Sequence, residues 1–556
     1  MVFRMVCFLH GLDSTMGHSM HSYHGDIFTM KKNGPKIRGK FNTMGNQFPW
    51  SAMMFHAPWD PPCFFGTGQQ HPLGAGRPYF TDTAATAPRT MVMGPQQHPL
   101  GAGPGEPRRV AVIGAGAAGL CAARHLSAAG VPCTVFEQTG HVGGTWVYNE
   151  RVGLDQFGLP VHSSMYRNLR INIPKHVMCY PDFPFKKGGR SYATHQEIRD
   201  YLKNYAQHFD LHQFVQHYSH VKRVAPQGSR WSVVVEDLKS GRVTEEVFDA
   251  VLVCNGHYSV PYTPTVPNMS LYGGVSMHSH DYREPSRFAG ADVVVLGANA
   301  SGLDIAVEVA KVANTVYLSH NKDPVPSRLP DNVRQVKGIK EATEDGFLLL
   351  DGSTVRADAV IFATGYEFSF PFLAPECGVR VVNNRVVPLY KHMLHRERPT
   401  MALIGIPYCV VPFVIFHYQI RYFLSLFLGR VPLPPREQME REEEEDLQKH
   451  LLKFPARHTH KMADLQWPYL RELAAAGSFE DDMWPVVQEV YDAVEDDRKH
   501  QLLVYRSIEY NVTGRDSYER VLPSTSSTPA APAGLMTKQQ PPQQHLHHHQ
   551  QPLQIK

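Results

Sequence analysis

The chain has 556 residues, and its 55 basic and 52 acidic side chains leave a formal net charge of only +3. This near-balance gives no support to nucleic-acid binding, which calls for a strongly basic surface. The eight cysteines form no Cys-x-x-Cys pair and no Cys/His grouping with zinc-finger spacing, so we expect reduced thiols and no metal site. A chain of this length predicts about three or four domain-sized units.

Both ends of the chain have a composition that does not favour a packed core. Residues 1–105 are rich in Gly, Pro, Met and His, and they repeat the stretch Gln69–Gly76 as Gln96–Gly103. Residues 523–556 are rich in Ser, Pro, Ala and Gln and include a cluster of histidines. Such segments bury too little apolar surface to offset chain entropy, so we predict that both are disordered and carry no chemistry.

A strand, a glycine loop and a helix follow the first tail. Residues 109–114 form a short apolar run that enters Gly114-Ala-Gly-Ala-Ala-Gly119, and residues 117–129 have the pattern of a helix. A second apolar run, which begins at Pro132, ends at Glu137. The three glycines permit a tight turn beside a pyrophosphate, and Glu137 is placed to accept hydrogen bonds from ribose hydroxyls. We therefore predict dinucleotide binding; a glycine-rich turn that packs a helix on a sheet is the alternative.

The same order of elements returns at residues 292–319. The second loop, Gly297-Ala-Asn-Ala-Ser-Gly302, has Asn299 where the middle glycine usually stands, and we expect Asn to be tolerated because it adopts left-handed geometry more readily than most residues. The next strand ends without an acid, so His320 or Lys322 can pair with a 2'-phosphate, which favours NADPH over NADH. A solvated polar turn is the alternative. The residues expected at this second site are Gly297, Asn299, Ser301, Gly302, Ser319, His320 and Lys322.

The duplication extends beyond the loops. Each unit is followed by a predicted hairpin and by an Asp-Ala-Val strand that ends in a glycine turn, at residues 249–257 and 358–366. Two copies of one plan predict two related nucleotide-binding domains, the second inserted into the first. Two nucleotides held by one chain are usually brought together to pass electrons, so we interpret the chain as a redox enzyme.

Two motifs resemble those of one family. His141-Val-Gly-Gly-Thr-Trp146 is similar to the FAD-binding segment of flavin-containing monooxygenases. The stretch Tyr272–Arg283 resembles their identifying motif, Phe-x-Gly-x-x-x-His-x-x-x-Tyr/Phe, with Tyr272 in place of the Phe. Its Tyr282-Arg283 disfavours the related Baeyer-Villiger enzymes, whose motif ends in Trp followed by Pro or Asp. Packing at a domain junction explains His278 and Tyr282 better than direct catalysis does.

The resemblance includes two shorter segments within matches that cover residues 108–475. Residues 168–175 are similar to the family segment that holds an Asn close to the flavin ring, and this Asn maps onto Asn172. A cap on the turn before Pro174 is the alternative role for Asn172. Ala363-Thr-Gly-Tyr366 resembles the linker that leaves the NADP domain, which makes Thr364 and Gly365 a hinge, a cofactor contact or a plain strand exit.

The resemblance implies an α/β fold with two Rossmann-like dinucleotide-binding domains of the glutathione-reductase-like type. The FAD-binding domain is expected in two parts, residues 106–265 and, with a C-terminal helical region, 363–522. The NADP-binding domain, residues 266–362, is inserted between them. The expected FAD-binding residues are Gly114, Gly116, Gly119, Glu137, Gly143, Gly144, Thr145 and Trp146.

The implied activity is that of an NADPH- and O2-dependent monooxygenase, similar to N,N-dimethylaniline monooxygenases. FAD reduced by NADPH would form a C4a-hydroperoxide that oxygenates a soft N or S atom of a small amine or sulfide, with Asn172 as the catalytic amide. A catalytically degenerate relative that binds nucleotides, or an NADPH oxidase or diaphorase of the same fold, is the alternative. A disulfide reductase would need a redox Cys pair, which the sequence lacks.

The most apolar stretch, residues 401–416, does not predict a membrane span. Pro407 and Pro412 interrupt it, so about 20 consecutive apolar residues never accumulate. We predict that this stretch is a buried wall of the active site. The sequence favours a cytoplasmic protein, with peripheral attachment to the endoplasmic reticulum membrane as the alternative, and leaves a homodimer open.

Overall fold

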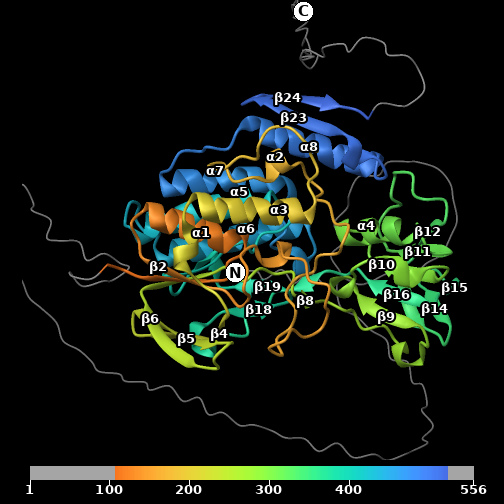
Figure 1. Cartoon of the computed structure of the whole chain (residues 1–556), viewed down its shortest axis with the longest axis horizontal. Coiled ribbons are helices and arrows are strands. Elements are labelled where there is room, and N and C mark those ends of the chain that lie inside the picture. Colours follow the sequence, from red (N-terminus) through yellow and green to blue (C-terminus); the bar gives the residue numbers. More distant parts are fainter. Residues whose placement is uncertain (1–106, 524–556) are drawn as a thin grey trace, which may run out of the picture. The chain divides into compact units, whose positions relative to one another are not determined.

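Two sheets, one mixed and one parallel throughout, carry the two glycine loops on parallel strands (Figure 1). The computed structural model describes residues 107–523, so the disorder predicted for residues 1–105 and 523–556 lies outside the described residues, apart from Pro523. No helix within residues 107–523 is long and apolar enough to cross a membrane.

The larger sheet has the strand order β20-β21-β22-β7-β1-β2-β3. Its central strand β1 pairs in parallel with β2 and β7, and all four of its residues are buried, as expected for an apolar run that is covered on both faces. The strands are β1 Val110–Ile113, β2 Cys133–Phe136, β3 Val215–Gln216, β7 Ala250–Val253, β20 Leu389–Tyr390, β21 Leu394–His395 and β22 Met401–Leu403.

The second sheet, with the order β12-β11-β10-β16-β9, is parallel throughout. Its strands are β9 Val275–His278, β10 Asp292–Leu296, β11 Thr315–Ser319, β12 Val333–Val336 and β16 Ala359–Phe362. The larger sheet is completed by strands from both sides of this segment, because β7, which precedes it, pairs in parallel with β22, which follows it. The predicted α/β fold, with one nucleotide-binding domain inserted into the other, is thereby confirmed.

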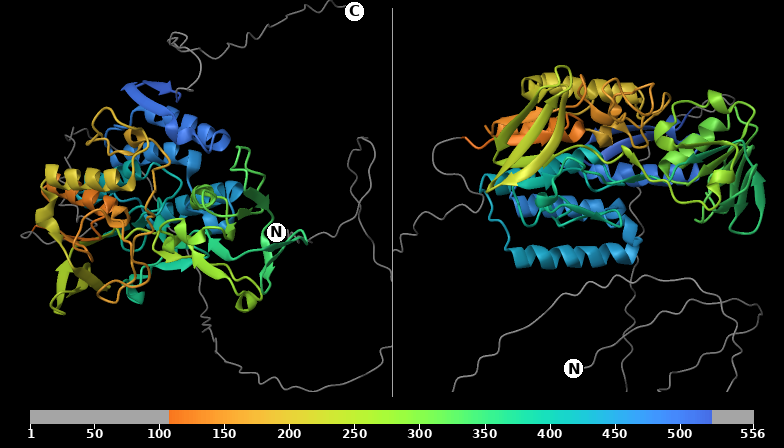
Figure 2. Two further views of the ribbon diagram at one scale, coloured as in Figure 1. Left: turned by 45° about the vertical axis from the view of Figure 1, so that its right-hand side comes forward. Right: turned by 90° about the horizontal axis from the view of Figure 1, so that it is seen from below.

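Helices from distant parts of the chain pack together beside the larger sheet. The views in Figures 1 and 2 show α5 lying close to both α1 and α7. The helices are α1 Ala117–Ala128, α2 Lys175–Met178, α3 His195–His208, α4 Ala300–Val309, α5 Pro412–Phe427, α6 Arg436–Lys453, α7 Gln466–Gly477 and α8 Pro485–His500.

The end of the apolar stretch at 401–416 begins a helix, Pro412–Phe427, that the sequence analysis missed. Residues 401–403 form β22, and Pro412 starts α5 at its first position, where a missing N–H costs nothing. Most residues of the stretch 401–416 are buried, as predicted, and the helix that continues from it is buried too; a role as a wall of the active site stays a prediction. The sequence analysis treats Pro407 and Pro412 as interruptions of the apolar stretch, whereas Pro412 is the first residue of helix α5.

Antiparallel strands complete the structure. A three-stranded sheet extends from each nucleotide-binding unit, and a hairpin packs on α8 near the C-terminal end of the described residues (Figure 1). The strands are β4 Ser219–Gln227, β5 Arg230–Asp237, β6 Val243–Phe248, β13 Ile339–Ala342, β14 Gly346–Leu349, β15 Thr354–Arg356, β18 Arg380–Val382, β19 Arg385–Val387, β23 Glu509–Gly514 and β24 Ser517–Val521.

Candidate functional site

The first glycine loop turns tightly between β1 and α1. Gly114 has a φ of +100°, and a Cβ added there would lie 2.8 Å from the Cys254 carbonyl oxygen. A Cβ at Gly119 would lie only 1.8 Å from the Gly114 oxygen. Gly116 precedes α1 without a side-chain cap, so the N–H groups of the first helical turn have no side-chain acceptor there. This is the geometry in which a helix N-terminus binds an anionic group.

The second pair of glycines lies directly on the first loop. The Gly143 N–H donates a hydrogen bond of 2.9 Å to the Ala115 oxygen, and a Cβ at Gly144 would lie 2.9 Å from the Gly116 Cα. Both glycines have positive φ, +121° and +56°. The Thr145 hydroxyl, in the following turn, is buried without a hydrogen-bond partner within residues 107–523. Its free hydrogen-bonding capacity fits a polar ligand held between the two loops.

Glu137 lies at the end of β2, beside the same loop. Its side chain is buried, and Oε2 accepts a hydrogen bond of 2.8 Å from the Ala115 N–H. Its other oxygen accepts from the N–H and the hydroxyl of Thr139, at 2.8 and 2.7 Å. These contacts fix the carboxylate and leave further acceptor positions on its oxygens, as ribose recognition requires. Trp146 lies half-buried against the core that contains α1.

Asn172 is half-buried between two buried residues, Ile171 and Ile173. Its amide makes no hydrogen bond to another described residue, and the residue that precedes α2 is Pro174, without a side-chain cap. The alternative role, a cap on the turn before Pro174, is therefore not observed. The amide remains available to a ligand.

The second glycine loop repeats the first. Gly297 has a φ of +112°, and a Cβ at Gly302 would lie 1.8 Å from the Gly297 oxygen. Asn299 is exposed and has φ −94° and ψ −168°, an extended conformation that any residue adopts. The reason given for tolerating Asn299, its left-handed propensity, was therefore wrong. The neighbouring Ser301 is also exposed.

Three polar residues at or just after the end of β11, Ser319, His320 and Lys322, make different contacts. Ser319 is fully buried, and its hydroxyl donates to the Lys337 oxygen at 2.8 Å. His320 is buried, with Nε2 3.1 Å from the Gln335 Oε1. Lys322 is exposed, and its Nζ donates to the Asn299 Oδ1 at 2.5 Å. Of the three, Lys322 is thus the charge that lies open beside the loop.

Two further basic residues near Lys322 were missed by the sequence analysis. Desolvation lowers the pKa of Lys322, and so do the positive charges of Lys461 and Arg498. These two residues come from the C-terminal part of the chain, more than 130 positions after Lys322. Because no spacing rule links them to the loop, only the fold places their charges within electrostatic reach of Lys322.

The chain passes between the two units twice, near Tyr262 and near Thr364, and hydrogen bonds join these two passages. The Thr364 hydroxyl donates to the Tyr262 oxygen at 2.5 Å, and the Tyr262 N–H donates to the Gly365 oxygen at 2.9 Å. The adjoining strands β8, Val260–Pro261, and β17, Tyr366–Glu367, form an antiparallel pair. Gly365 has a φ of +87°, so this turn favours glycine.

The motif at 272–283 is built into the junction. Its strand β9 lies at the edge of the second sheet, and the fully buried Tyr282 donates to the Glu308 Oε2 at 3.0 Å. Arg283 donates to the backbone oxygens of residues 149, 151 and 163 in the first unit, at 2.7–3.3 Å. Burial and the neighbouring His280 lower the pKa of His278 to about 4, so this ring is neutral near pH 7. These contacts support packing rather than proton transfer.

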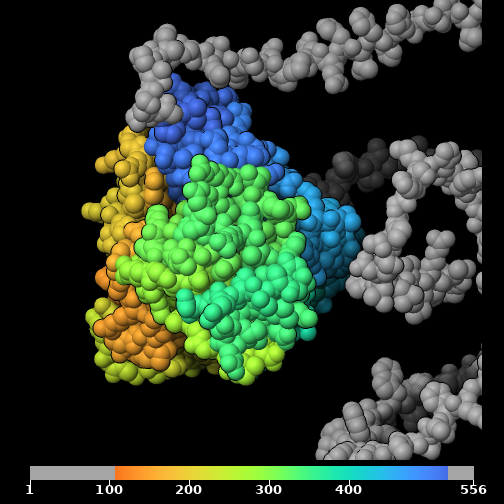
Figure 3. All heavy atoms as spheres, turned by 90° about the vertical axis from the view of Figure 1, so that its right-hand side faces the viewer, coloured from red at the N-terminus to blue at the C-terminus, as the bar shows by residue number. Residues whose placement is uncertain are grey.

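Helix α4 also binds the first unit, through residues that the sequence analysis did not identify. Arg506 donates two hydrogen bonds to Asp304, of 2.9 and 2.6 Å, and the Tyr166 hydroxyl donates to the same carboxylate at 3.0 Å. Asn168 donates to Glu308 at 2.6 Å. In Figure 3 the second unit, in green, adjoins the C-terminal residues in blue. These contacts join the unit that carries the second glycine loop to the unit that carries the first.

Known proteins match this chain over most of the described part. The flavin-binding monooxygenase-like family matches residues 107–333 and 320–483. The flavin-containing monooxygenase FMO GS-OX-like 2 of Arabidopsis thaliana is 35% identical over 444 residues, which cover 74% of this chain and 92% of the relative. Among solved structures, the S-allyl-L-cysteine S-oxygenase of Allium sativum is 35% identical, with a TM-score of 0.68 over 72% of this chain and 95% of its own. Tmm from Pelagibacter sp. is 26% identical, with a TM-score of 0.67 over 74% of this chain and 96% of its own.

Proposed function

Because this chain belongs to the flavin-binding monooxygenase-like family, we propose that it uses NADPH and O2 to oxygenate a soft sulfur or nitrogen atom of a small molecule. The enzyme is a flavin-containing monooxygenase with FAD and NADPH as cofactors. The observation that carries the assignment of the FAD site is the contact between the glycine pair 143–144 and the first glycine loop.

The chain's own residues fit FAD at the first loop. The N–H groups at the start of α1 would bind the pyrophosphate, and Glu137 would accept hydrogen bonds from the ribose hydroxyls. Thr145, whose buried hydroxyl has no partner in the described part of the chain, would donate to the same nucleotide. Bound FAD supplies the redox chemistry, which includes acceptance of hydride and activation of O2.

The second loop would hold NADPH, with its 2'-phosphate at the basic group Lys322, Lys461 and Arg498. Ser319 and His320 would then act through the shape of the loop, since their side chains bond to Lys337 and Gln335. The contacts of Arg283 and Asp304 between the units would keep the nicotinamide aligned with the flavin.

Asn172 would hydrogen-bond the reacting oxygen or the substrate. An amide adds no competing nucleophile and carries no proton that titrates near neutral pH, so it can stabilise developing charge without side reactions. The rest of the site positions the substrate and excludes water.

A sulfide is the substrate class that we place first. The S-allyl-L-cysteine S-oxygenase of Allium sativum, whose name states that it oxygenates sulfur, is 35% identical to this chain, which is more than the 26% identity of Tmm. An amine such as N,N-dimethylaniline is the second candidate, because a tertiary amine nitrogen is a similarly soft nucleophile.

A coupling measurement tests the proposal. The FAD-loaded protein is given NADPH and air with S-allyl-L-cysteine or N,N-dimethylaniline, and NADPH, O2, hydrogen peroxide and oxygenated product are quantified together. We expect product close to the amount of NADPH consumed with at least one of the two probes. NADPH consumption that yields only peroxide would indicate an oxidase, and no consumption would indicate a degenerate relative; either result contradicts the proposal.

A further inference from the structure

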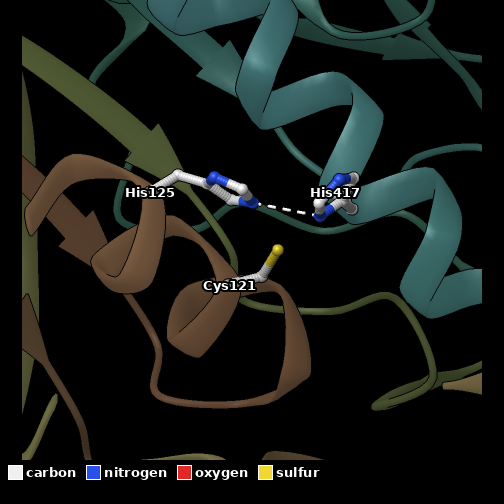
Figure 4. Close-up of side chains that lie close together, drawn as sticks. All are labelled: Cys121, His125 and His417. Carbon is white, nitrogen blue, oxygen red and sulfur yellow. Dashed lines mark hydrogen bonds between the residues drawn. The ribbon is translucent and has the colours of Figure 1, made fainter. Parts of the chain in front are cut away.

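Three metal-ligating side chains converge outside the two nucleotide loops. Cys121 and His125 lie one turn apart on α1, and His417 reaches them from α5 (Figure 4). One nitrogen or sulfur atom from each side chain lies within 4.8 Å of the others. Cys121 and His417 are buried, and His125 is half-buried. None of the three has a role in the proposed binding of FAD or NADPH.

The two imidazoles form a hydrogen bond with each other, and its length is close to the spacing of two ligands on one cation. The His125 Nε2 and the His417 Nδ1 are 3.1 Å apart. Tetrahedral zinc, with Zn–N bonds of about 2.0–2.1 Å, would separate two nitrogens by about 3.3 Å. In Figure 4 the Cys121 sulfur points toward the space between the two rings. To bind one cation, the three atoms would have to move from separations within 4.8 Å to those of zinc ligands.

The Asp482 carboxylate contacts the His417 ring on the side that faces away from His125. The His417 Nε2, which faces away from His125, lies 3.1 Å from the Asp482 Oδ2. Arg421 donates to the same oxygen at 2.7 Å and also lies 3.0 Å from the ring nitrogen. With its proton on Nε2, toward Asp482, the His417 ring would direct the lone pair of Nδ1 toward a metal, as in many zinc sites, and Arg421 would then donate to Asp482 alone.

A buried hydroxyl lies on the sulfur side. Tyr205 is fully buried beside Cys121, and its hydroxyl has no hydrogen-bond partner that meets ordinary geometry among residues 107–523. A neutral thiol is a weak acceptor, whereas a metal-bound thiolate is a charged one. A cation at this position would therefore provide the acceptor that the Tyr205 hydroxyl lacks.

The other histidine and carboxylate group, His392, Asp446 and His450, is less suited to a metal. The Val386 N–H donates to the His460 Nε2, so the proton of neutral His460 is on Nδ1, which lies 2.8 Å from the His392 Nδ1. His392 then carries its proton on Nε2, toward Asp446 at 2.8 Å. The lone pair of the His392 Nδ1 is thus used by His460, so the His392 ring has none left for a metal.

We propose that Cys121, His125 and His417 bind a zinc ion that joins α1 to α5. One sulfur and two imidazole ligands match the preference of zinc, and a water molecule on the side of half-exposed His125 would complete the tetrahedron. Since α1 begins at the FAD-binding loop, the ion would stabilise the position of this helix relative to α5, and with it the position of the loop. The proposal does not depend on the reaction assigned to the enzyme.

Metal content tests the proposal in the full-length, FAD-loaded protein. The wild type, Cys121→Ala and a control, Cys133→Ala, which removes a half-buried thiol on β2, are incubated with Zn²⁺, dialysed and analysed for zinc per chain. We expect the wild type and Cys133→Ala to retain about one zinc more than Cys121→Ala. The histidine cluster near the C-terminus contributes equally to all three proteins. Equal zinc in the wild type and Cys121→Ala would overturn the proposal.

The absorption spectrum of bound Co²⁺ tests the same site independently of zinc content. A second variant, His125→Gln, shows whether a loss of metal is due to misfolding. Tetrahedral Co²⁺ gives visible ligand-field bands at longer wavelengths than flavin absorption, and any contribution from the C-terminal histidines is the same in the wild type and the variant. We expect these bands in the wild type and their loss in His125→Gln, whose FAD content verifies folding. A chelator should lower the melting temperature of the wild type and leave that of His125→Gln unchanged. Absence of the bands in the wild type would refute the site.

Discussion

At the scale of single residues, Gly116 and Gly119 stand in one loop but meet different neighbours. A Cβ at Gly119 would collide with the Gly114 oxygen at 1.8 Å, whereas a Cβ at Gly116 would make an ordinary contact of 3.5 Å with the Gly144 Cα. Gly119 is thus required by the packing of the protein itself. Gly116 leaves space that the protein does not fill, where we place the FAD pyrophosphate.

We predict that Gly119→Ala and Gly116→Ala fail in different ways. Gly119→Ala should destabilise the FAD-free protein by about 3 kcal/mol, because backbone must shift to admit the methyl group. Gly116→Ala should keep its FAD-free melting temperature and bind FAD much more weakly. Calorimetry without FAD and a fluorescence titration with FAD measure the two effects. The assignment fails if Gly116→Ala binds FAD with wild-type affinity.

We predict that Asn172→Ala separates flavin reduction from oxygenation. Product formation should fall by about a hundredfold, the loss typical of one preorganised donor, while FAD content and NADPH oxidation persist with peroxide release. Asn204→Ala, which removes an exposed amide from α3, is the matched control. Wild-type product yield in Asn172→Ala would remove Asn172 from the reaction.

We predict that Lys322 distinguishes the two nicotinamide cofactors. Lys322→Ala should raise the KM for NADPH by about tenfold, because a charge-assisted hydrogen bond contributes about 1.5–3 kcal/mol. The KM for NADH, which lacks the 2'-phosphate, should change little. Lys340→Ala, an exposed lysine on β13, should change neither value. An unchanged ratio of the two KM values in Lys322→Ala would exclude Lys322 from the phosphate site.

Local spacing predicted the loop residues better than the residues that complete the sites. The glycines and Glu137 follow a fixed pattern along one strand-loop-helix unit, so the sequence alone placed them together. Lys461 comes near Lys322 only through the fold, and His125 meets His417 across 292 positions. A single sequence carries no signal for such contacts, which is why the Cys/His group was not expected.

At the scale of elements, β1 and α1 show how accurately the hydrophobic pattern of the sequence predicts where a strand or a helix begins and ends. The predicted strand 109–114 is observed as Val110–Ile113, and the predicted helix 117–129 as Ala117–Ala128. In the second unit the helix predicted after the loop is observed as Ala300–Val309. Helix α5 was missed because proline both interrupts and starts helices, and only packing against α1 and α7 distinguishes the two cases.

Helix α4 provides the contact that we expect to align the two cofactors. Asp304→Asn keeps the shape of the side chain but removes the charge that Arg506 binds, so we predict a loss of about 2 kcal/mol in the free energy of unfolding. Flavin reduction by NADPH should slow more than FAD binding weakens, because the two units lose a fixed orientation. Urea denaturation and stopped-flow reduction measure these quantities.

Asp516→Asn is the control for this variant, since Asp516 is exposed in the turn between β23 and β24, away from both glycine loops. It should match the wild type in both measurements. A reduction rate in Asp304→Asn equal to that of the wild type would show that this ion pair does not control the relation between the units.

At the scale of the whole molecule, the insertion of one nucleotide-binding unit into the other was predictable from duplication. The two copies have the same order of strands, loop and helix, and the larger sheet closes around the insertion through the pairing of β7 with β22. The register and the ion pairs between the units depend on side-chain packing, which the repeated pattern does not encode. The substrate depends on the same packing, so the sequence narrowed the chemistry to soft nucleophiles without naming one.

The origin of the oxygen atom in the product tests the central claim most directly. The FAD-loaded enzyme is mixed with NADPH and S-allyl-L-cysteine, and in parallel with N,N-dimethylaniline, under isotopically labelled O2 in unlabelled water, and the products are analysed by mass spectrometry. The account predicts a sulfoxide or N-oxide that carries one labelled oxygen atom for each NADPH consumed. An unlabelled product, or NADPH consumption that yields labelled peroxide without product, would contradict it.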